Sequence, residues 1–464
     1  MTATIRIPSV AKEKVGVLGL ARSGLAAAEA FRDSGAEVCA WDDDPAKRAR
    51  AEAKGIVCRD LATSDLDGFL ALVMSPGIPH THPKPHPAAS RAKAAGVPLL
   101  SDIEFLGRAC PQARFIGITG TNGKSTTTTL IGHLLKEAGM QVQVGGNLGV
   151  PALSLAPLGR GGVYVLEMSS YQLELLQRLV FDVAVLLNIT PDHLERHGGM
   201  DGYVAAKRRI FERQDSEDTA IVAIDDAESE AIYDDLVETG KQQVTPISAT
   251  RLVSGGVYVE DGLLTDDTGG WGNPVLHLDI AQALPGRHNW QNAAAAYAVG
   301  RVFDIGSRAL AKSLVTYPGL AHRQERIAVV DGVTYINDSK ATNADAAAKA
   351  LACYESVYWI AGGKAKEGGI EPLASYFADL RHVFLIGEAA EGFARTLEGK
   401  APYTRSGDLA SAVAAATAKA KAEGLKNAIV LLSPACASFD QFADFEARGE
   451  AFRKLVEALP GARA

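Results

Sequence analysis

The stretch Ile118–Leu130, with the sequence ITGTNGKSTTTTL, decides how the fold of the whole chain is interpreted. The apolar, β-prone residues Phe115–Thr119 predict a strand, and the spaced apolar residues after Lys124 predict a helix. A glycine-containing loop between a strand and a helix turns backbone N–H groups inward at the positive end of the helix, which suits phosphate. Lys124 would neutralise the terminal phosphates, and the Ser125 hydroxyl would bind a phosphate-bound Mg²⁺. The stretch therefore predicts a nucleotide phosphate site.

The loop is shorter than a strict P-loop. A strict P-loop has a glycine five residues before Gly123, and this chain has Ile118 there. The loop is therefore a Thr-Gly-Thr-Asn-Gly-Lys-Ser variant, Thr119–Ser125. The alternative interpretation is a glycine-rich turn that carries a surface lysine, which the strand–loop–helix context disfavours.

Composition and charge describe an ordinary globular chain. Of the 464 residues, 47% are hydrophobic and 22% are charged, and this length predicts about two to four domains. The net charge of -8 argues against a large nucleic-acid-binding surface but not against a local phosphate site. The five cysteines are scattered without CxxC spacing, which favours reduced thiols over a disulfide framework or a zinc site. Since the chain shows no signal-peptide pattern and no run of about 20 apolar residues, we expect a cytoplasmic protein without membrane insertion.

The first block has a strand–helix–strand pattern in Val15–Leu18, Leu25–Asp33 and Val38–Trp41. It resembles a dinucleotide-binding fingerprint, with three acids after the second strand, but Ala21 stands where the middle glycine is expected. The pattern predicts nucleotide binding. An NAD(P)-dependent dehydrogenase stays open as an alternative that rests on this turn alone.

Two further segments complete this block. Leu70–Met74 predicts a strand that ends in Ser75–Pro79, which is either a ligand-binding turn at the carboxyl edge of the sheet or a plain turn. The histidines of His80–Pro87 alternate with prolines, which indicates an extended exposed loop rather than a metal cluster. A helix around Asp102–Arg108 then leads to the phosphate loop, so we place the first domain boundary near Gly107.

The rest of the chain alternates strands and helices in two blocks. In the second block three apolar strands end in polar residues, which predicts that these residues share one edge of a parallel sheet. The three polar strand ends are Gly146–Gly149, Glu167–Ser170 and Asn188–His193. Asp201–Gln214 predicts a basic helix, and residues 219–285 predict further strands with polar turns.

The third block repeats the doubly wound pattern. Its predicted strands are Val333–Asn337, Val357–Ala361, Val383–Ile386 and Ile429–Leu432, with alanine-rich helices between them. The predicted fold class is α/β in three domains. These are a Rossmann-like domain over 1–106, a central P-loop-type parallel sheet with helices over 107–318, and a C-terminal Rossmann-like domain over 319–464.

A metal ion beside the phosphates needs hard oxygen ligands. Ser125 supplies one, and Glu167 is the best-placed carboxylate because it ends a strand of the same predicted sheet. His193 would be an unusual ligand for Mg²⁺, which prefers oxygen. Taken singly, Glu167 could equally be a helix-capping acid and His193 a turn residue, but their joint placement at the phosphate edge favours a functional role.

With these residues in place, the chain resembles a known family, the ATP-dependent Mur amino-acid ligases of peptidoglycan synthesis. The matching motifs run along essentially the whole chain: Gly120–Ser125, Gly146–Asn147, Glu167–Ser170, Asn188–His193, Ala206–Lys207, Gly286–Asn289, Leu320–Arg323 and Asn337–Asn343. The C-terminal stretch Leu432–Phe442, followed by Phe445–Gly449, is similar to that of the family members that add D-glutamate.

The resemblance implies a role for individual residues. Catalytic roles are implied for Lys124, Glu167, His193 and Lys207. Two Mg²⁺ ions are implied, with Ser125, Glu167, His193 and a Lys207 carbamylated on its side chain as ligands. ATP contacts are implied for Gly120, Thr121, Asn122, Gly123, Lys124, Ser125, Thr126, Thr127, Asn292, Arg323 and Asp338. Substrate contacts are implied for Ala21, Arg22, Asp42, Asp43, Ser75, Gly77, Asn147, Ser169, Gln172, Thr342, Lys366, Ser438 and Phe445. The alternative for Lys207 is a plain lysine on a basic helix, and Lys364 competes with Lys366.

The reaction implied by the resemblance is the ATP-dependent joining of D-glutamate to UDP-N-acetylmuramoyl-L-alanine through an acyl phosphate, as a step of cell wall biogenesis. The first domain would bind the UDP, which accounts for its imperfect dinucleotide fingerprint. We expect a monomer with these two substrates as partners and no nucleic acid, and the base that deprotonates the amine stays open. Two rival interpretations are a folylpolyglutamate-synthase-like ligase and a catalytically silent nucleotide-binding paralogue. The C-terminal stretch disfavours the former, and the intact set of expected catalytic residues disfavours the latter.

Overall fold

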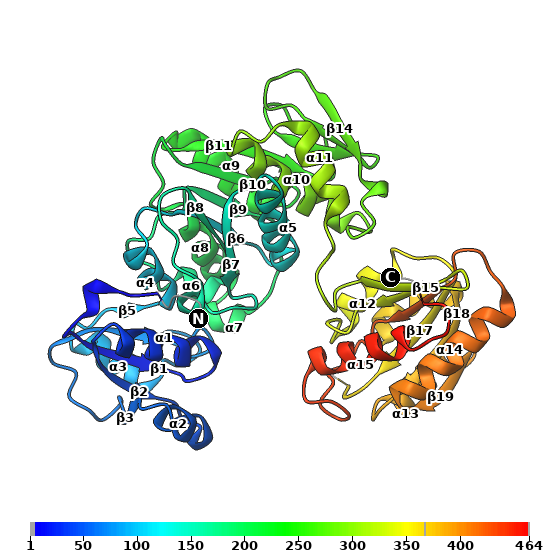
Figure 1. Cartoon of the computed structure of the whole chain (residues 1–464), viewed down its shortest axis with the longest axis horizontal. Coiled ribbons are helices and arrows are strands. Elements are labelled where there is room, and N and C mark those ends of the chain that lie inside the picture. Colours follow the sequence, from blue (N-terminus) through cyan, green and yellow to red (C-terminus); the bar gives the residue numbers. More distant parts are fainter. Residues whose placement is uncertain (1–4, 366–367, 463–464) are drawn as a thin grey trace. The chain divides into compact units, whose positions relative to one another are not determined.

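The computed structural model describes residues 5–365 and 368–462, which form two compact units (Figure 1). The first unit comprises Met1–Leu278 and Asn289–Thr316, and the second comprises Asp279–His288 and Tyr317–Ala464. Within the described residues the strands form sheets of five, nine and six strands, the first two in the first unit and the third in the second. Helices alternate with strands along the chain, so the predicted α/β class is confirmed. The three predicted domain boundaries stay a prediction.

The five-stranded sheet is parallel throughout, in the order β3-β2-β1-β4-β5. The elements of this part are β1 (Lys14–Leu18), α1 (Arg22–Asp33), β2 (Glu37–Trp41), α2 (Pro45–Glu52), β3 (Val57–Cys58), β4 (Phe69–Met74), α3 (Pro87–Ala94), β5 (Leu99–Leu100) and α4 (Asp102–Ala109), after a short 3-10 turn at Pro8–Val10. Phe31 of α1 packs edge-on against Phe105 of α4, with ring centroids 4.8 Å apart. The buried core therefore continues from this sheet into the next one.

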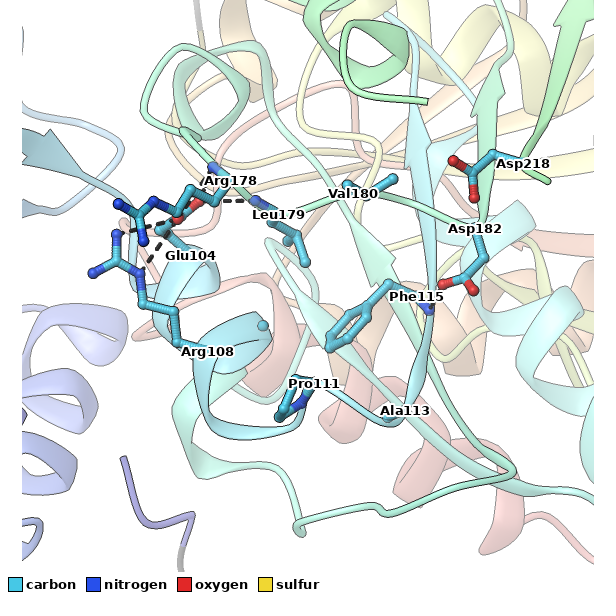
Figure 2. A pocket seen from close by; sticks show the side chains of 11 residues that line it. Glu104, Arg108, Pro111, Ala113, Phe115, Arg178, Leu179, Val180, Asp182 and Asp218 are labelled. Atoms are coloured by element: carbon cyan, nitrogen blue, oxygen red, sulfur yellow. Dashed lines mark hydrogen bonds and ion pairs between the residues drawn. The ribbon is translucent and has the colours of Figure 1, made fainter. Parts of the chain in front are cut away.

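The helix α4 is held to the central sheet by Glu104 (Figure 2). Its buried carboxylate accepts the backbone N–H groups of Gln177, Arg178 and Leu179 at 3.0 to 3.2 Å. Burial alone would raise the pKa of Glu104, but these donors and the nearby Arg108 outweigh burial and lower it. An ionised carboxylate thus joins the helix to the turn before β9 (Val183–Leu186).

Asp102, in the first turn of α4, gives a prediction about stability. Its side chain is buried, and burial raises its pKa from 3.8 to about 6 despite hydrogen bonds from Ser101 and Ile103. Because the pKa is higher in the folded state, protonated Asp102 stabilises the fold below pH 3.8, and this contribution is lost as the pH rises through about 6. We expect Asp102→Asn to raise the melting temperature at about pH 7.5, by the equivalent of about 3 kcal/mol at most, and to change it little at about pH 4.

Scanning fluorimetry at the two pH values measures this difference. Asp67→Asn, at an exposed carboxylate of the same unit, is the matched control and should shift the melting temperature little at either pH. A melting temperature of Asp102→Asn that stays below the wild-type value at neutral pH would contradict the prediction.

The nine-stranded sheet contains the phosphate loop and has the order β14-β13-β12-β11-β10-β9-β6-β8-β7. The strands from β7 across to β12 pair in parallel, and β13 and β14 extend the sheet by antiparallel pairing. Its strands are β6 (Arg114–Thr119), β7 (Gln141–Gly146), β8 (Gly162–Glu167), β9, β10 (Thr219–Ala223), β11 (Gln243–Ser248), β12 (Val257–Glu260), β13 (Leu263–Asp266) and β14 (Asn273–His277). The helices are α5 (Lys124–Glu137), α6 (Ser170–Leu173), α7 (Leu194–His197), α8 (Met200–Arg208), α9 (Ala227–Thr239), α10 (His288–Val302) and α11 (Ser307–Thr316), with 3-10 turns at Ala152–Ser154, Arg209–Phe211 and Leu278–Ile280. Strands β8, β9 and β10 are buried at every position, as their continuous apolar runs predict.

Two predictions for this part need correction. The predicted basic helix over 201–214 is α8, which ends at Arg208 and passes into the short 3-10 turn. The region 219–285 contains the helix α9 in addition to the predicted strands. Asp226 caps this helix by accepting the backbone N–H of Ser229 at 2.9 Å, a capping signal that is present in the sequence.

The second unit is built on the six-stranded sheet β15-β16-β20-β17-β18-β19, in which only β15 pairs antiparallel among the described strands. Its elements are β15 (Glu325–Val330), β16 (Val333–Asn337), α12 (Ala344–Leu351), β17 (Val357–Gly362), the 3-10 helix Glu371–Asp379, β18 (Leu380–Ile386), α13 (Ala390–Leu397), β19 (Tyr403–Gly407), α14 (Leu409–Glu423), β20 (Ile429–Leu432) and α15 (Phe445–Glu457). Two apolar clusters, one on each face, make this the doubly wound arrangement that the alternating pattern predicts.

Candidate active site

The phosphate loop runs from the end of β6 at Thr119 to the start of α5 at Lys124. Gly123 caps α5 with a φ of 84°, and a Cβ at this position would lie 2.3 Å from Asn292 Oδ1. Only glycine fits here, because the left-handed backbone and the close side chain both exclude a Cβ. Ile118 is fully buried inside β6, so the glycine missing from a strict P-loop falls within a strand and not within the loop.

The segment after β9 holds this loop from the side. The backbone N–H of Thr121 donates to Asn188 O, and the N–H of Asn122 donates to Asn188 Oδ1, both at 2.8 Å. The backbone N–H of Thr190 in turn donates to the Thr121 hydroxyl at 3.0 Å. On the far side, the Thr127 hydroxyl donates to Asn292 Oδ1 at 3.0 Å, which brings α10 against the start of α5.

Two lysines converge on the loop. Lys124 Nζ donates to Gly120 O and Thr121 O at 2.8 Å, and Lys207 Nζ donates to the same Gly120 O at 2.7 Å. Lys207 is 1% exposed, and its ammonium lies 4.6 Å from the centroid of the Tyr203 ring. Burial and then the charge of Lys124 lower the pKa of Lys207 well below its ordinary value, and the carboxylate of Asp192 offsets this only in part. Burial at this site therefore disfavours the charged form of the Lys207 amine.

Glu167 ends β8 beside the phosphate loop, since its register partner in β6 is Ile118. Its side chain is 3% exposed; Oε1 accepts a hydrogen bond from Asn147 Nδ2 at 2.8 Å, while the buried Oε2 has no hydrogen-bond partner among the described residues. A buried carboxylate oxygen that accepts no hydrogen bond can coordinate a metal cation. Gly146 permits this arrangement, because a Cβ there would lie 2.5 Å from Glu167 O. The capping alternative is wrong, since Ser169 caps the helix α6 that follows.

His193 sits at the start of α7 with a left-handed φ of 53°. Its side chain is half exposed, its Nε2 lies 3.4 Å from Asp192 Oδ2, and its ring lies 5.4 Å from that of Tyr171 in α6. Within residues 5–365 and 368–462, no three His, Cys, Asp or Glu side chains gather closely enough to bind a metal ion.

Ser169 and Gln172 satisfy one another in a reciprocal capping box. Ser169 Oγ accepts the backbone N–H of Gln172 at 3.3 Å, and Gln172 Oε1 accepts the backbone N–H and the hydroxyl of Ser169 at 3.0 and 2.9 Å. With Asn147 bonded to Glu167, the three residues expected to contact the muramoyl part lie on the segments that follow β7 and β8.

The residues expected to contact UDP surround the turn between β1 and α1. Asp42 stabilises the backbone of its own domain, since its carboxylate oxygens accept hydrogen bonds from the backbone N–H groups of Leu20 at 2.7 Å and Asp44 at 2.9 Å. Burial alone would raise the pKa of Asp42, but these donors and Lys47 outweigh it and lower that pKa. The Ser75 hydroxyl donates to Gly19 O at 3.1 Å. The exposed members of the set are Ala21, Arg22, Asp43 and Gly77.

In the second unit, Asp338 follows β16 and is buried, and burial raises its pKa to about 7 despite a hydrogen bond from Ser433 Oγ at 2.7 Å. Arg323 lies close enough for its charge to offset part of this effect. Phe445 is covered by Lys340, whose Nζ lies 3.7 Å from the ring centroid. Ser438 is buried, Thr342 is partly buried and Lys364 is exposed, whereas Lys366 lies outside the described residues.

Arg448 is a site residue for which the sequence predicted no role. It is 1% exposed and donates to Ser339 O at 2.9 Å, Ser339 Oγ at 3.0 Å and Cys436 O at 3.0 Å. Burial lowers its pKa to about 10. By joining the chain after β16 to the chain after β20, Arg448 supports the loops that carry Thr342 and Ser438. Its place inside the matching stretch Phe445–Gly449 is the signal that could have identified it.

A pocket of about 300 Å³ lies at the opposite edge of the nine-stranded sheet (Figure 2). Asp182 precedes β9 and Asp218 precedes β10, so both belong to the amino ends of strands whose carboxyl ends approach the phosphate loop. Ligands of open parallel sheets bind at the carboxyl ends. This pocket is therefore not part of the candidate active site.

The sequence matches two models of one protein family. A model of the Mur ligase middle domain matches residues 118–300, and a model of the Mur ligase glutamate ligase domain matches residues 322–436. A curated relative from Rhodospirillum rubrum is 53% identical over 469 residues, covering 100% of this chain and 98% of the relative. The chain belongs to the Mur ligase family. This relative and one from Paramagnetospirillum magneticum, 52% identical over 98% of both chains, are named UDP-N-acetylmuramoylalanine–D-glutamate ligase.

Solved Mur ligase structures share the fold. The UDP-N-acetylmuramate-alanine ligase of Thermotoga maritima superposes with a TM-score of 0.58 at 17% identity, covering 96% of this chain and 99% of the other. The UDP-N-acetylmuramoylalanyl-D-glutamyl-2,6-diaminopimelate–D-alanyl-D-alanyl ligase of Acinetobacter baumannii gives a TM-score of 0.55 at 20% identity, over 77% and 80% of the two chains. Among the described residues, no helix has the length and apolar character needed to cross a bilayer.

Proposed function

We propose that this Mur ligase uses ATP to join D-glutamate to UDP-N-acetylmuramoyl-L-alanine in peptidoglycan synthesis. The observation that carries the proposal is the 53% identity, over the full chain, to a relative named for this reaction. The geometry supports the reaction class, because a phosphate loop, two lysines and a buried carboxylate oxygen meet at one sheet edge. The location proposed is the cytoplasm, where ATP is available, and the proposed assembly is a monomer.

The chemistry proposed is activation of a carboxylate by phosphoryl transfer. The loop from Gly120 to Gly123 and the ammonium of Lys124 hold the β- and γ-phosphates of ATP, while the substrate carboxylate attacks the γ-phosphorus and ADP leaves. The neutral amine of D-glutamate then attacks the acyl carbon and gives up one proton, the C–O bond to phosphate breaks, and amide and inorganic phosphate form. Positioning and charge neutralisation supply most of the rate enhancement in such a transfer.

Mg²⁺ would neutralise phosphate charge at this edge, and the chain offers residues that fit it. Glu167 Oε2 is buried and lacks a hydrogen bond among the described residues, and Ser125 lies in the first turn of α5, next to the proposed phosphate loop. A second ion is proposed at His193 and Lys207. The buried amine of Lys207 is suited to carbamylation, because CO₂ adds only to a neutral amine and the product is a carboxylate-like oxygen ligand.

The remaining contacts are proposed by motif. The turn between β1 and α1 and the segment Ser75–Gly77 would bind UDP, with Asp42 shaping the turn from within. Asn147, Ser169 and Gln172 would meet the muramoyl part. Asn292, Arg323 and Asp338 would contact ATP, and Thr342, Ser438 and Phe445 would form the D-glutamate pocket. We retain three domains, over 1–106, 107–318 and 319–464.

The proposal predicts which amino acid is consumed. Phosphate release from ATP should require UDP-N-acetylmuramoyl-L-alanine and D-glutamate together. L-glutamate, L-alanine and meso-diaminopimelate should each support less than about 1% of that rate, since a site shaped for the amine and both carboxylates of D-glutamate would leave a polar group unpaired with each of these analogues. A coupled phosphate-release assay with mass spectrometry of the product measures this. Equal turnover with L-glutamate, or turnover with a folate in place of the UDP-linked substrate, would overturn the proposal.

A further inference from the structure

The stretch His80–Pro87 is exposed or partly exposed from Thr81 onward, as its composition predicts, but it begins with a buried histidine. His80 is 7% exposed, although His82 nearby is exposed. The ring of His80 is buried because it packs against residues of the nine-stranded part of the first unit, where Glu174 follows α6 and Arg196 lies in α7. Burial of a histidine at this junction needs an explanation, because the proposed chemistry does not use it.

Glu174 lies at the centre of the junction. Its Oε1 accepts a hydrogen bond from His197 Nδ1 at 3.1 Å. Its Oε2 is buried without a hydrogen bond among the described residues. It lies 3.4 Å from His80 Nε2 and 3.9 Å from a nitrogen of the positively charged Arg196. The carboxylate therefore bridges a histidine of the UDP-proposed part and a histidine of the central part.

Arg196 contacts three residues of the chain segment that contains His80. One guanidinium nitrogen donates to Ile78 O at 3.3 Å and lies 3.1 Å from His80 Nδ1, and the other donates to the Thr81 hydroxyl at 3.2 Å. The guanidinium also lies 5.0 Å from the centroid of the Tyr171 ring. Since arginine only donates, His80 Nδ1 is the acceptor, and the ring proton sits on Nε2, facing Glu174.

The His80 ring keeps this tautomer near neutral pH. Burial, together with the charges of Arg196 and Lys93, lowers its pKa to about 4, against the opposing effect of Glu174. The groups that face it are Glu174, Arg196, Lys93 and His197. The contact is therefore constant over the physiological pH range and does not act as a switch.

Each member of the junction adjoins a different part of the proposed substrate site. His80 lies three residues after Gly77, at the end of the UDP-proposed segment Ser75–Gly77. Glu174 ends the helix that Ser169 caps, and His197 Nε2 lies 2.9 Å from the Ser170 hydroxyl. The junction thus ties the segment proposed for the diphosphate to the segment proposed for the muramoyl part.

We propose that His80, Glu174 and Arg196 are positioning residues that hold Ser75–Gly77 and Ser169–Gln172 at a fixed separation, so that one UDP-linked substrate reaches both segments. The inference rests on the proposed function and deepens it. A ligand that spans two segments binds tightly only if their spacing is set in advance, whereas a ligand that touches one segment does not sense the spacing.

The test compares two ligands by titration calorimetry on the full chain. His80→Gln and Glu174→Gln should each raise the Kd for UDP-N-acetylmuramoyl-L-alanine about tenfold, and leave the Kd for UDP within about twofold of wild type. The double variant should show less than the product of the two single effects, because both changes break one junction. His82→Gln, the same change at an exposed histidine two residues away, is the matched control and should alter neither Kd.

The outcomes distinguish a failure of the positioning role from a failure of the proposed function. If the variants weaken both ligands equally, or weaken neither, the positioning role is overturned while the proposed function stands. If the wild-type chain binds UDP but not UDP-N-acetylmuramoyl-L-alanine, the proposed function fails and this inference fails with it. Melting temperatures of the variants, measured alongside, identify any variant that has lost its fold, and the remaining single variant then decides.

Discussion

Replacing Lys124 by alanine is expected to lower substrate-dependent phosphate release by about 10³-fold or more. The Lys124 ammonium lies at the start of α5 and donates to Gly120 O and Thr121 O, so it stands where the phosphates of ATP would approach the loop. Charge that moves onto the leaving ADP in the transition state would lose its nearest cation. Rates are measured by a coupled assay at saturating ATP and both substrates.

The control for this variant is Lys136→Ala, at an exposed lysine in the last turn of the same helix. It removes the same charge about 18 Å further along α5, by the rise of 1.5 Å per residue, and should keep nearly full activity. If Lys124→Ala turns over at a rate close to that of Lys136→Ala, the phosphate role of the loop is refuted. A near-normal melting temperature for both variants excludes unfolding as the cause of any loss.

The sequence predicted those features that depend on local pattern. Apolar runs bounded by glycine and polar residues located β6, β8 and β9, because strands buried on both faces must be apolar throughout. The polar residues after these strands share a sheet edge, since strand order and parallel direction bring Glu167 beside Ile118. The role of glycine in the phosphate loop was also predicted from the sequence. The structure gives Gly123 a left-handed backbone that other residues rarely adopt.

Features that depend on distant partners could not be predicted. The burial of His80 results from Glu174 and Arg196, which lie about 90 to 120 residues further along the chain, and no local pattern encodes that contact. The same holds for Lys207, whose amine reaches from α8 to Gly120 O in the phosphate loop. The helix α9 was not predicted because its hydrophobic pattern is weak, although the capping acid Asp226 was visible.

Lys207→Ala is expected to lower turnover by about 100-fold or more, and a small carboxylate should restore part of it. Lys207 is fully buried, so truncation leaves room where acetate can enter and present oxygen atoms at the position of the proposed carbamate. Lys207→Met removes the amine but fills most of the space, so it should lose as much activity and gain nothing from acetate. The contrast between the two variants assigns the loss to a missing oxygen ligand and not to a cavity.

The matched control is Arg208→Ala. This variant removes the next basic side chain of α8, which is exposed and paired with Asp235, and it should leave the rate within about twofold of wild type.

Wild-type enzyme in bicarbonate-depleted buffer should lose activity and regain it when bicarbonate is added, since the carbamate forms reversibly on a neutral amine. ¹³C-bicarbonate should give a carbamate NMR signal in wild type and none in Lys207→Met. If the rate does not change with bicarbonate, and acetate does not restore activity to Lys207→Ala, the carbamylation proposal is refuted. Lys207 would then act only as a hydrogen-bond donor to Gly120 O. We expect the result that supports carbamylation. A buried Lys207 ammonium is repelled by the charge of Lys124 and has no carboxylate in hydrogen-bonding contact among the described residues, whereas a negatively charged carbamate would be attracted to Lys124.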